Sequence, residues 1–504
     1  MKTLKLLFNK VFWVALFVIV QCAIFVISAT YLYSYFWYIN LFFSLFGVVT
    51  FLVIVNAEST PEMKLPWLVL VCLAPLLGCV LYAMFSQNNV KRHYDKNASK
   101  NREVFDAAIK ESIRLSPTAE TFNATGLPRL LRENCGFPAM QNTQVTYFPF
   151  GEAMFESLLK DLQSAKYFIF MEYFIIEQGK MWNSILEILK QKVSEGVDVR
   201  VVYDDIGSAR RLRSGYYKKL RKMGISCEKF NPFRPIVSGV HNNRDHRKIT
   251  VIDGQIAYTG GVNMADEYIN HTHPLGTWKD TAIRLNGEGV NAFTLLFLGC
   301  YQKLTGKIST PTAFLTAEGV ADSAFVQPFG TGPKSVYRDG IAESILLNLI
   351  YSAQEKLWIT TPYFIVSHSI KSALCDAALR GVDVRLITPR IPDKKLVYAM
   401  TRSNYAPLLS AGVKILEYAP GFIHAKNVVV DENIAMCGTI NLDYRSLSHH
   451  FECGAVLYGG QAVSDMRKDF EETALECIEI PTDFHQKPLT RLLCALLRIF
   501  APLL

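Results

Sequence analysis

Charged residues are scarce in this sequence, and so are the patterns by which cysteines form disulfides or bind zinc. Asp, Glu, Lys and Arg make up 19% of the 504 residues, against about 25% in typical soluble domains. The mean hydropathy of +0.16 excludes a disordered chain and indicates membrane-embedded sequence. The 11 cysteines are an odd number without a Cys-x-x-Cys pair. This argues against a disulfide framework or a zinc site and is typical of a reducing compartment.

The charge balance is mildly basic, with 53 Lys and Arg against 45 Asp and Glu, for a formal net charge of +8. A modest positive charge suits an anionic partner. Lipid headgroups and nucleic acid both meet that description, so charge alone does not choose between them.

Long apolar runs fill the first ninety residues and account for the high hydropathy. They cover residues 11–29, 41–55 and 65–85. A helix needs about 20 apolar residues to span a bilayer, whereas the apolar core of a cleaved signal peptide has about 7–15. Because apolar sequence recurs up to Phe85, we expect residues 1–90 to be a membrane anchor with two or three transmembrane helices.

Basic residues flank these runs on both sides. Lys2, Lys5 and Lys10 precede the first run, and a basic stretch from Lys91 to Arg102 follows the last. The positive-inside rule places both flanks in the cytoplasm, which requires an even number of crossings. We favour two spans, with one of the three runs interfacial or re-entrant and the catalytic region cytoplasmic. Three crossings are the alternative.

After Arg102 the sequence repeats itself in four blocks that keep their order. The matched pairs are "AKYFIFMEYFII" from Ala165 with "EKLWITTPYFIV" from Glu355, "GVDVRVVYDD" from Gly196 with "GVDVRLITPR" from Gly381, "GISCEKFNP" from Gly224 with "GVKILEYAP" from Gly412, and "HRKITVIDGQIAYTGGVN" from His246 with "HAKNVVVDENIAMCGTIN" from His424. Four matches in one order predict two homologous halves.

Each half alternates helical periodicity with short β-branched runs. Residues 153–165 and 341–353 predict helices, each followed by a strand. The expected fold class is α/β, with two homologous halves, each a sheet flanked by helices, that form one active site. The expected boundaries are 1–90 for the anchor, 91–135 for a linker, 136–308 for the first half, 309–333 for a connecting segment, 334–487 for the second half and 488–504 for an amphipathic C-terminal helix.

The last pair of blocks carries one polar pattern twice. The first copy consists of His246, Lys248, Asp253, Gly260, Gly261 and Asn263, and the second of His424, Lys426, Asp431, Gly438, Thr439 and Asn441. A histidine and a lysine two positions apart on a strand point to the same face. Two such half-sites would surround one tetrahedral anion. Phosphoryl transfer needs a nucleophile, a proton donor and positive charge on the nonbridging oxygens, and this set supplies all three.

A single His-x-Lys pattern more often marks a solvated strand than a site. Its recurrence at one spacing inside a repeat makes the solvated strand the weaker interpretation. Two histidines and two lysines can carry the reaction without a metal ion, so we expect no metal and no other cofactor.

The duplicated motif resembles that of the phospholipase D superfamily. Together with the hydrophobic runs, the segment from Asn56 and the C-terminal "LLCALLRIFAPLL", it is similar to the bacterial cardiolipin synthases, over nearly the whole chain. The resemblance implies a membrane transphosphatidylase that joins two phosphatidylglycerols into cardiolipin and glycerol. The alternative is a phosphodiester hydrolase of the same superfamily, acting on phospholipid or, less favoured beside a membrane, on nucleic acid.

The resemblance also implies roles for the motif residues. One histidine attacks the lipid phosphate and forms a phosphohistidine, and the other protonates the departing alcohol. Family analogy favours His246 as the nucleophile, although the sequence leaves both assignments open. The remaining assignments are Lys248, Lys426, Asn263 and Asn441 as phosphate ligands, Asp253 and Asp431 as the remaining members of the catalytic motif, through direct contact or by fixing the local turn, and Asp280 and Glu452 as the carboxylates that hydrogen-bond the histidines.

The implied partners are phosphatidylglycerol and cardiolipin, and the implied location is the bacterial cell membrane, with a multi-pass anchor and a cytoplasmic catalytic region. No nucleic acid is expected, and the oligomeric state stays open. The basic run from Arg210 to Lys222 is either a solvated helix face or a contact for anionic headgroups. Residues 489–504 either lie in the membrane interface or pack on the domain.

Overall fold

The computed structural model describes residues 36–85, 125–232, 242–306, 310–334 and 336–503, with a few isolated positions outside these ranges. The chain divides into two compact units. One contains residues 1–95, 233–242 and 495–504, and the other contains residues 96–232 and 243–494.

The smaller unit contains α3 (Phe36–Val55), α4 (Pro61–Leu73), α5 (Pro75–Phe85) and the 3₁₀ turn η6 (Ala501–Leu503). Residues 65–85 do not form one helix, because Ala74 leaves helical geometry just before Pro75, a residue without a backbone N–H. Helices α4 and α5 then approach so closely that a Cβ on Gly78 would lie 2.6 Å from the Cα of Val71. Only glycine allows this approach.

Apolar side chains on α3 are largely exposed within the described residues, including Phe42, Leu45, Val49 and Leu52. None of the helices in the described part of the chain combines the length and the hydropathy of a membrane-crossing segment. The run 11–29 lies almost entirely outside the described residues. The expected membrane crossings therefore stay a prediction.

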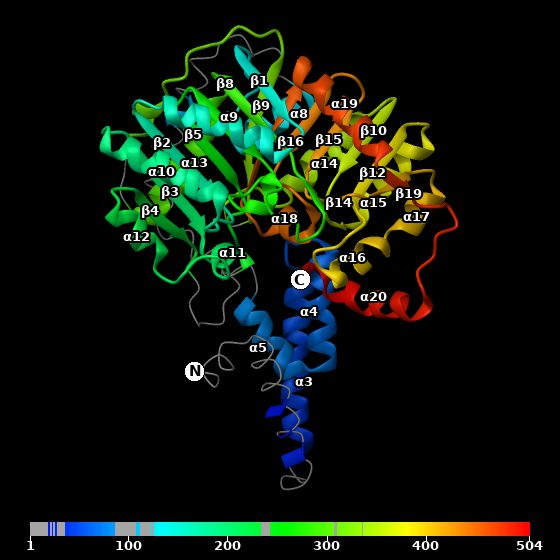
Figure 1. Ribbon diagram of the computed structural model, residues 1–504. Coiled ribbons are helices and arrows are strands. Elements are labelled where there is room, and N and C mark those ends of the chain that lie inside the picture. Colours follow the sequence, from blue (N-terminus) through cyan, green and yellow to red (C-terminus); the bar gives the residue numbers. More distant parts are fainter. Residues whose placement is uncertain are drawn as a thin grey trace. The chain divides into compact units, whose positions relative to one another are not determined.

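The larger unit contains two sheets of matching topology (Figure 1). The first has the order β1-β8-β6-β5-β2-β3-β4. Its strands are β1 (Thr143–Phe148), β2 (Phe168–Tyr173), β3 (Asp198–Asp204), β4 (Ser226–Phe230), β5 (Lys248–Ile252), β6 (Ile256–Gly260) and β8 (Ala282–Gly287). The β2–β3 and β3–β4 pairs are parallel and the other pairs antiparallel.

The second sheet has the order β9-β18-β16-β15-β10-β12-β13-β19. Its strands are β9 (Phe325–Thr331), β10 (Lys356–Thr360), β12 (Asp383–Pro389), β13 (Lys414–Tyr418), β15 (Asn427–Val430), β16 (Ile434–Gly438), β18 (Glu452–Tyr458) and β19 (Cys477–Glu479). Apart from β19, each strand has a counterpart at the same place in the first sheet. The prediction of two homologous α/β halves is therefore confirmed.

Helices cover both faces of each sheet. The first half contains α9 (Gly151–Ser164), α10 (Lys180–Ser194), α11 (Asp205–Ser208), α12 (Tyr216–Lys222), η4 (Asp266–Ile269), α13 (Val290–Thr305) and η5 (Pro311–Phe314). The second contains α8 (Gly126–Cys135), α14 (Ile341–Ser352), α15 (His368–Leu379), α16 (Lys395–Arg402), α17 (Tyr405–Ser410), α18 (Tyr444–Ser448) and α19 (Gln461–Leu475), and α20 (Pro488–Phe500) follows. Helices α9 and α14 confirm the two helices predicted at 153–165 and 341–353.

The core follows from strand alternation. Ile169 and Met171 on β2 belong to the apolar cluster that includes α9 and α10, whereas Phe170, between them, stacks on Phe297 of α13. In the second half, Trp358 of β10 stacks on Phe470 of α19 in the same way. Helix α13 also contacts β9, and α19 contacts β1. These two helices therefore pack between the halves.

Two boundaries differ from those expected from the sequence. Helix α8 lies within the expected linker, yet its buried Leu127 and Leu131 belong to the core cluster of the second half. Strand β9 lies within the expected connecting segment, yet it pairs with β18 along its whole length. Both segments join the second half through pairings with residues far away in sequence, which local composition does not report.

Candidate active site

Each motif folds as a strand, a tight turn and a second strand, so His246 and His424 lie just before β5 and β15 near the centre of their sheets. Both histidines are buried, with 6% and 7% of their surfaces exposed. The side chain of Lys248 turns back and donates a hydrogen bond to the carbonyl of His246 at 2.6 Å. Lys426 donates to the carbonyl of His424. Each histidine therefore has its lysine on the same side of the strand.

A backbone exchange between the halves supplies the partner of each histidine. The N–H of His246 donates to the carbonyl of Phe451 at 2.9 Å, and the N–H of His424 donates to that of Lys279 at 2.7 Å. In the second case β14 (Gly421–Ile423) pairs with β7 (Thr277–Lys279) in parallel. The residue after each carbonyl is a carboxylate from the opposite half.

These carboxylates bind the histidines through Nδ1. Glu452 has its Oε2 atom 2.9 Å from Nδ1 of His246, and Asp280 has its Oδ2 atom 2.6 Å from Nδ1 of His424. Both carboxylates are fully buried. Both contacts orient the rings, and at His246 the bond favours the tautomer in which Nε2 carries the free lone pair. Nδ1 of His424 also lies 2.8 Å from Nζ of Lys426. The structure thus places Asp280 and Glu452 where a histidine-supporting carboxylate is needed.

Burial dominates the electrostatics of the site. It lowers the pKa of Lys248 to about 8 and that of Lys426 to about 7, against the attraction of the nearby carboxylates. It lowers the pKa of His246 to about 3, against the attraction of Glu452, and also lowers the pKa of His424. Lys248 contributes to the lowered pKa of His424, so the two half-sites share one electrostatic environment. Before substrate binds, both imidazoles are neutral.

The two carboxylates differ in their surroundings. Burial raises the pKa of Asp280 to about 7, opposed by Lys426. Burial also acts to raise the pKa of Glu452, but its interactions with His246 and His450 outweigh this and hold the pKa below its usual range. Thr439 donates a further hydrogen bond to Glu452. At the position matching Thr439, Gly261 has no side chain, and a Cβ there would lie 1.9 Å from Oδ1 of Asp280. Glycine is required beside Asp280 for this reason.

The two asparagines are not equivalent. Asn263 accepts a hydrogen bond from the N–H of Ile175 at 3.1 Å and donates one to the hydroxyl of Tyr268 at 2.8 Å. The side-chain oxygen of Asn441 is buried and has no partner among the described residues. Asn441 is therefore the one of the two with an uncommitted polar atom.

Of the two roles expected for Asp253 and Asp431, direct contact at the site or fixing of the local turn, the contacts in the structure match the second. Both lie after the far end of their strands, in a left-handed conformation with φ of 51°. Asp253 accepts hydrogen bonds from the N–H groups of Lys166, Tyr167 and Phe168 at 2.7 to 2.8 Å. Asp431 does the same for residues 354–356. These aspartates join the motif turn to the start of the neighbouring strand, away from the histidines.

Asp253→Ala is therefore expected to act on stability. Loss of an ionised acceptor for three N–H groups should lower the free energy of unfolding by about 2–4 kcal/mol. Asp253→Asn is the matched control, because asparagine keeps one acceptor oxygen and tolerates positive φ. Thermal unfolding of the purified protein, with the specific activity of the folded fraction, checks this. An alanine variant with an unchanged midpoint but no activity would return Asp253 to the catalytic set.

The lowered lysine pKa values predict how anion binding depends on pH. Lys426 and Lys248 lose their charge as the pH rises through about 7 and about 8, and Asp280 gains one near pH 7. All three changes make the site less positive. Affinity for sulfate, whose own charge stays constant, should fall by about tenfold or more between pH 6.5 and pH 9. Titration calorimetry tests this, and Lys426→Met should flatten the dependence; an affinity that rises with pH contradicts it.

Two acidic residues near the motif, Glu172 and Asp204, have structural partners. Glu172 forms a buried ion pair with Arg247 at 2.8 Å. Asp204 pairs with Arg244 at 2.7 Å and caps α11 through the N–H groups of Ile206 and Gly207. Because Arg247 lies between His246 and Lys248 in sequence, its side chain points to the opposite face of the strand. These residues support the site from behind.

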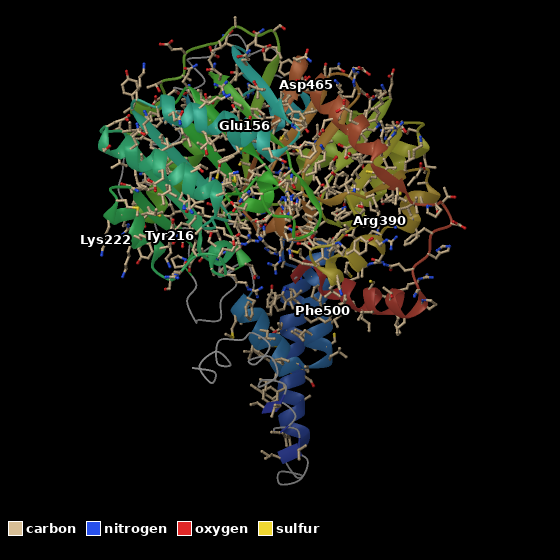
Figure 2. All side chains as sticks on the ribbon, viewed as in Figure 1. Glu156, Tyr216, Lys222, Arg390, Asp465 and Phe500 are labelled. Atoms are coloured by element: carbon tan, nitrogen blue, oxygen red, sulfur yellow. The ribbon has the colours of Figure 1, made fainter. Side chains whose placement is uncertain are left out.

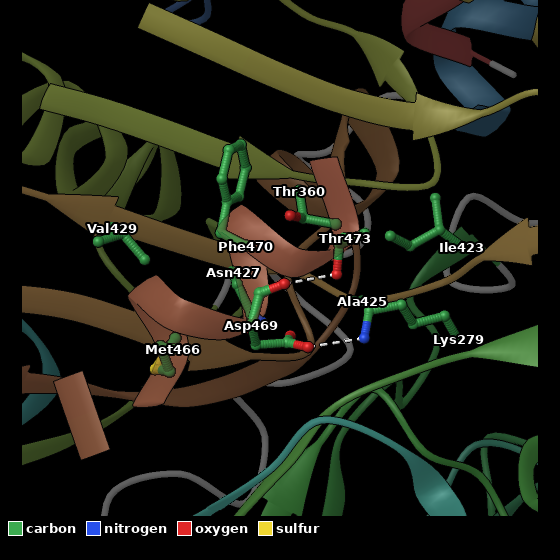
Figure 3. Close-up of a pocket in the computed structure, with 10 residues that line it drawn as sticks. All are labelled: Lys279, Thr360, Ile423, Ala425, Asn427, Val429, Met466, Asp469, Phe470 and Thr473. Atoms are coloured by element: carbon green, nitrogen blue, oxygen red, sulfur yellow. Dashed lines mark hydrogen bonds and ion pairs between the residues drawn. The ribbon is translucent and has the colours of Figure 1, made fainter. Parts of the chain in front are cut away.

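In the second half, the face of β15 opposite the motif side chains lines a small pocket (Figure 3). Its lining includes Ala425 and Asn427, which alternate with His424 and Lys426 along the chain, so it opens on the opposite face from the motif side chains. Lys279 and Asp469 form a buried ion pair there at 2.7 Å. This pocket is separate from the histidine–lysine cluster.

Sequence reasoning left out one residue at the site, His450. Together with His246 and Glu452, it forms a group of buried atoms that are close enough to bind a metal ion, and Glu172, Asp245 and Cys300 form a second such group. In the second group Arg247 already pairs with both acids, so a cation does not fit there. In the first, the ammonium group of Lys248 lies beside His246 and opposes a bound cation. The only sequence signal for His450 was its place two residues before Glu452.

The chain matches two known protein families. Residues 158–281 and 346–474 match the family described as "Cardiolipin synthase, PLD-like domain", and residues 41–87 match "Phospholipase_D-nuclease N-terminal". The two longer segments contain both His-x-Lys motifs.

Similar proteins cover nearly the whole chain. Cardiolipin synthase 2 of Bacillus anthracis is 36% identical, with 91% of this chain and 90% of the relative covered. Cardiolipin synthase of Halalkalibacterium halodurans is 35% identical over 84% of each chain. The crystal structure of phosphatidylserine synthase from Haemophilus influenzae has the same fold, with a TM-score of 0.57 at 17% identity, over 75% of this chain and 97% of that one. This chain belongs to the cardiolipin synthase family of phospholipase D-like enzymes.

Proposed function

We propose that this protein is a cardiolipin synthase, which joins two phosphatidylglycerols and releases glycerol. The observation that carries the proposal is the reciprocal pairing of His246 with Glu452 and of His424 with Asp280 across the two halves. Each half contributes one histidine and the carboxylate that orients the other. The reaction therefore needs both halves in one site.

In the first step, Nε2 of one neutral histidine attacks the phosphorus of a phosphatidylglycerol. A P–N bond forms, the P–O bond to the headgroup glycerol breaks, and the other histidine donates a proton to the leaving oxygen. Burial keeps the attacking imidazole neutral and nucleophilic. The negative charge of the bound phosphate raises the pKa of the second imidazole, so that it carries the proton that the leaving group needs.

In the second step, a headgroup hydroxyl of another phosphatidylglycerol attacks the phosphohistidine. Its proton passes to the second histidine, the P–N bond breaks, and cardiolipin forms. Lys248 and Lys426, together with the side-chain NH2 group of Asn441 as a donor, would bind the nonbridging oxygens as charge develops. Family analogy favours His246 as the nucleophile, and trapping of the phosphorylated enzyme followed by peptide mapping tests that assignment.

Hydrolysis by the same chemistry is the alternative, with water as the acceptor. Burial of both histidines favours transfer, because a site that excludes bulk water protects the phosphohistidine from hydrolysis. In both reactions the substrates are lipids, and no nucleic acid takes part.

The test uses the full chain in detergent with labelled phosphatidylglycerol and EDTA. Cardiolipin and glycerol are expected in equal amounts, with the rate unchanged by the chelator because the lysines supply the positive charge. Phosphatidic acid as the main product would favour the hydrolase. Loss of turnover in EDTA that one divalent cation restores would contradict the metal-free mechanism.

We further propose that residues 1–90 anchor the protein in the bacterial cell membrane as a multi-pass segment, with the catalytic region in the cytoplasm. The apolar sequence, the match of residues 41–87 to the N-terminal family, and the exposed apolar face of α3 support this. Helix α20 also exposes Leu489, Leu492 and Leu496.

The orientation is tested with Lys222→Cys, at an exposed position on α12 (Figure 2). In intact cells this cysteine should resist impermeant thiol reagents, and labelling from outside would overturn the orientation.

A further inference from the structure

His450 is a buried histidine beside the catalytic pair that no step of the proposed mechanism uses. It lies between α18 and β18 and is only 8% exposed. Its ring centroid is 5.6 Å from that of His246, and its Nδ1 atom is 3.7 Å from Oε1 of Glu452. Neither ring nitrogen has a hydrogen-bond partner among the described residues.

The pseudo-symmetry of the site gives His450 a counterpart. The residue before each motif histidine pairs with the residue before the carboxylate of the other half: Asp245 with Phe451, and Ile423 with Lys279. Two positions before the carboxylates, His450 and Trp278 therefore occupy equivalent places. The indole ring of Trp278 lies 5.7 Å from the ring of His424. Its Nε1 atom also has no partner among the described residues.

Each buried polar group without a hydrogen-bond partner carries a desolvation cost. The ring centroid of His450 is 5.6 Å from that of His246 and its Nδ1 atom is 3.7 Å from Glu452, so His450 lies on the side on which Glu452 contacts His246. A ligand oxygen at that place would satisfy the unpaired ring nitrogen. Trp278 can only donate a hydrogen bond, whereas an imidazole can donate or accept. The two ends of the site therefore differ in the groups they can bind.

We propose that His450 is a substrate-binding residue, a third imidazole of the site that takes a headgroup oxygen of the lipid at the His246 end. The inference rests on the proposed function and deepens it. With its proton on Nδ1, toward Glu452, the ring presents Nε2 as an acceptor for a glycerol hydroxyl. With a proton on Nε2, it donates to a nonbridging phosphate oxygen.

The experiment compares transfer to two alcohols. The purified full chain receives phosphatidylglycerol in micelles with either radiolabelled glycerol, which exchanges into the lipid, or ethanol, which yields phosphatidylethanol. Inhibition by inorganic phosphate is measured in parallel. The variants are His450→Phe, which removes both nitrogens, and His450→Gln, which keeps an amide donor and acceptor. His449→Phe is the matched control at the adjacent, half-buried histidine, and thermal unfolding midpoints verify folding.

If His450 binds a hydroxyl, His450→Phe lowers the ratio of glycerol to ethanol transfer by about tenfold. If it binds a phosphate oxygen, the ratio stays constant and the inhibition constant for phosphate rises by about tenfold. In either case His450→Gln lies between the wild type and His450→Phe, and His449→Phe matches the wild type.

A uniform loss of rate with both measures unchanged would overturn the proposal and leave His450 a packing residue. So would an effect that occurs only with added Zn²⁺, because His450 would then belong to an adventitious metal group with His246 and Glu452. If the wild-type protein transfers to no alcohol, the proposed transferase function fails instead. The phosphate inhibition of its hydrolysis would still test His450.

Discussion

Replacing either His246 or His424 by alanine is expected to lower the turnover of phosphatidylglycerol by three orders of magnitude or more, to about the detection limit. Each half of the chain holds one of the two reacting imidazoles, and neither half holds both. Without the nucleophile no phosphohistidine forms, and without the acid the glycerol oxygen leaves unprotonated. Initial rates of cardiolipin formation in detergent give the measurement.

The control for these variants is His485→Ala, a histidine at an exposed position after β19, the last strand of the second half. It should retain the wild-type rate. An equimolar mixture of the two inactive variants should also stay inactive, because both histidines of a site come from one chain. More than about a tenth of the wild-type rate in either single variant would contradict the single-site model, and recovery on mixing would show that the site is shared between chains.

Glu452→Gln and Asp280→Asn are expected to lower kcat by about 10²–10³ each, with a smaller change in KM. Each amide nearly preserves the shape of the acid but removes the charge that stabilises the imidazolium, and it no longer fixes the tautomer. The two contacts are 2.9 Å and 2.6 Å between buried groups, so solvent cannot replace the lost charge. The measurement is the dependence of the initial rate on lipid concentration.

Asp161→Asn is a matched change of acid to amide away from the histidines, where the carboxylate pairs with Arg284 at 2.7 Å. It should affect stability more than kcat. If Glu452→Gln and Asp280→Asn behaved like Asp161→Asn, the carboxylates would hold the two halves together without supporting the histidines. A pH–rate profile that shifts only in the two site variants separates these outcomes.

Each half of the fold was predictable from the sequence because its signals are local. Periodicity predicted the helices at 153–165 and 341–353, and the spacing of the motif placed His246 with Lys248 and His424 with Lys426. The family resemblance supplied the candidates Asp280 and Glu452. It also placed Asp253 and Asp431 in the catalytic motif, where the structure shows them holding backbone N–H groups of a neighbouring strand.

In the block that begins at Ala165, the sequence alignment of the two halves differs from the structure by two positions. The sequence pairs Lys166 with Lys356, but the hydrogen bonds to Asp253 and Asp431 pair Lys166 with Gln354. A run of apolar and β-branched residues looks much the same when shifted by two positions, because the side-chain alternation has that period. Only the bonds to a fixed neighbour decide the register.

The sequence alone determined that this protein has two α/β halves, each with a histidine–lysine pair suited to a phosphate. Tertiary structure alone decided which carboxylate supports which histidine and that α8 and β9 belong to the second half. It also placed His450 beside His246, with no hydrogen-bond partner for its ring nitrogens among the described residues. The reason is physical. Residues a few positions apart are related by the geometry of one strand or helix, whereas Glu452 and His246 meet through packing between segments about two hundred residues apart, and no local pattern records that packing.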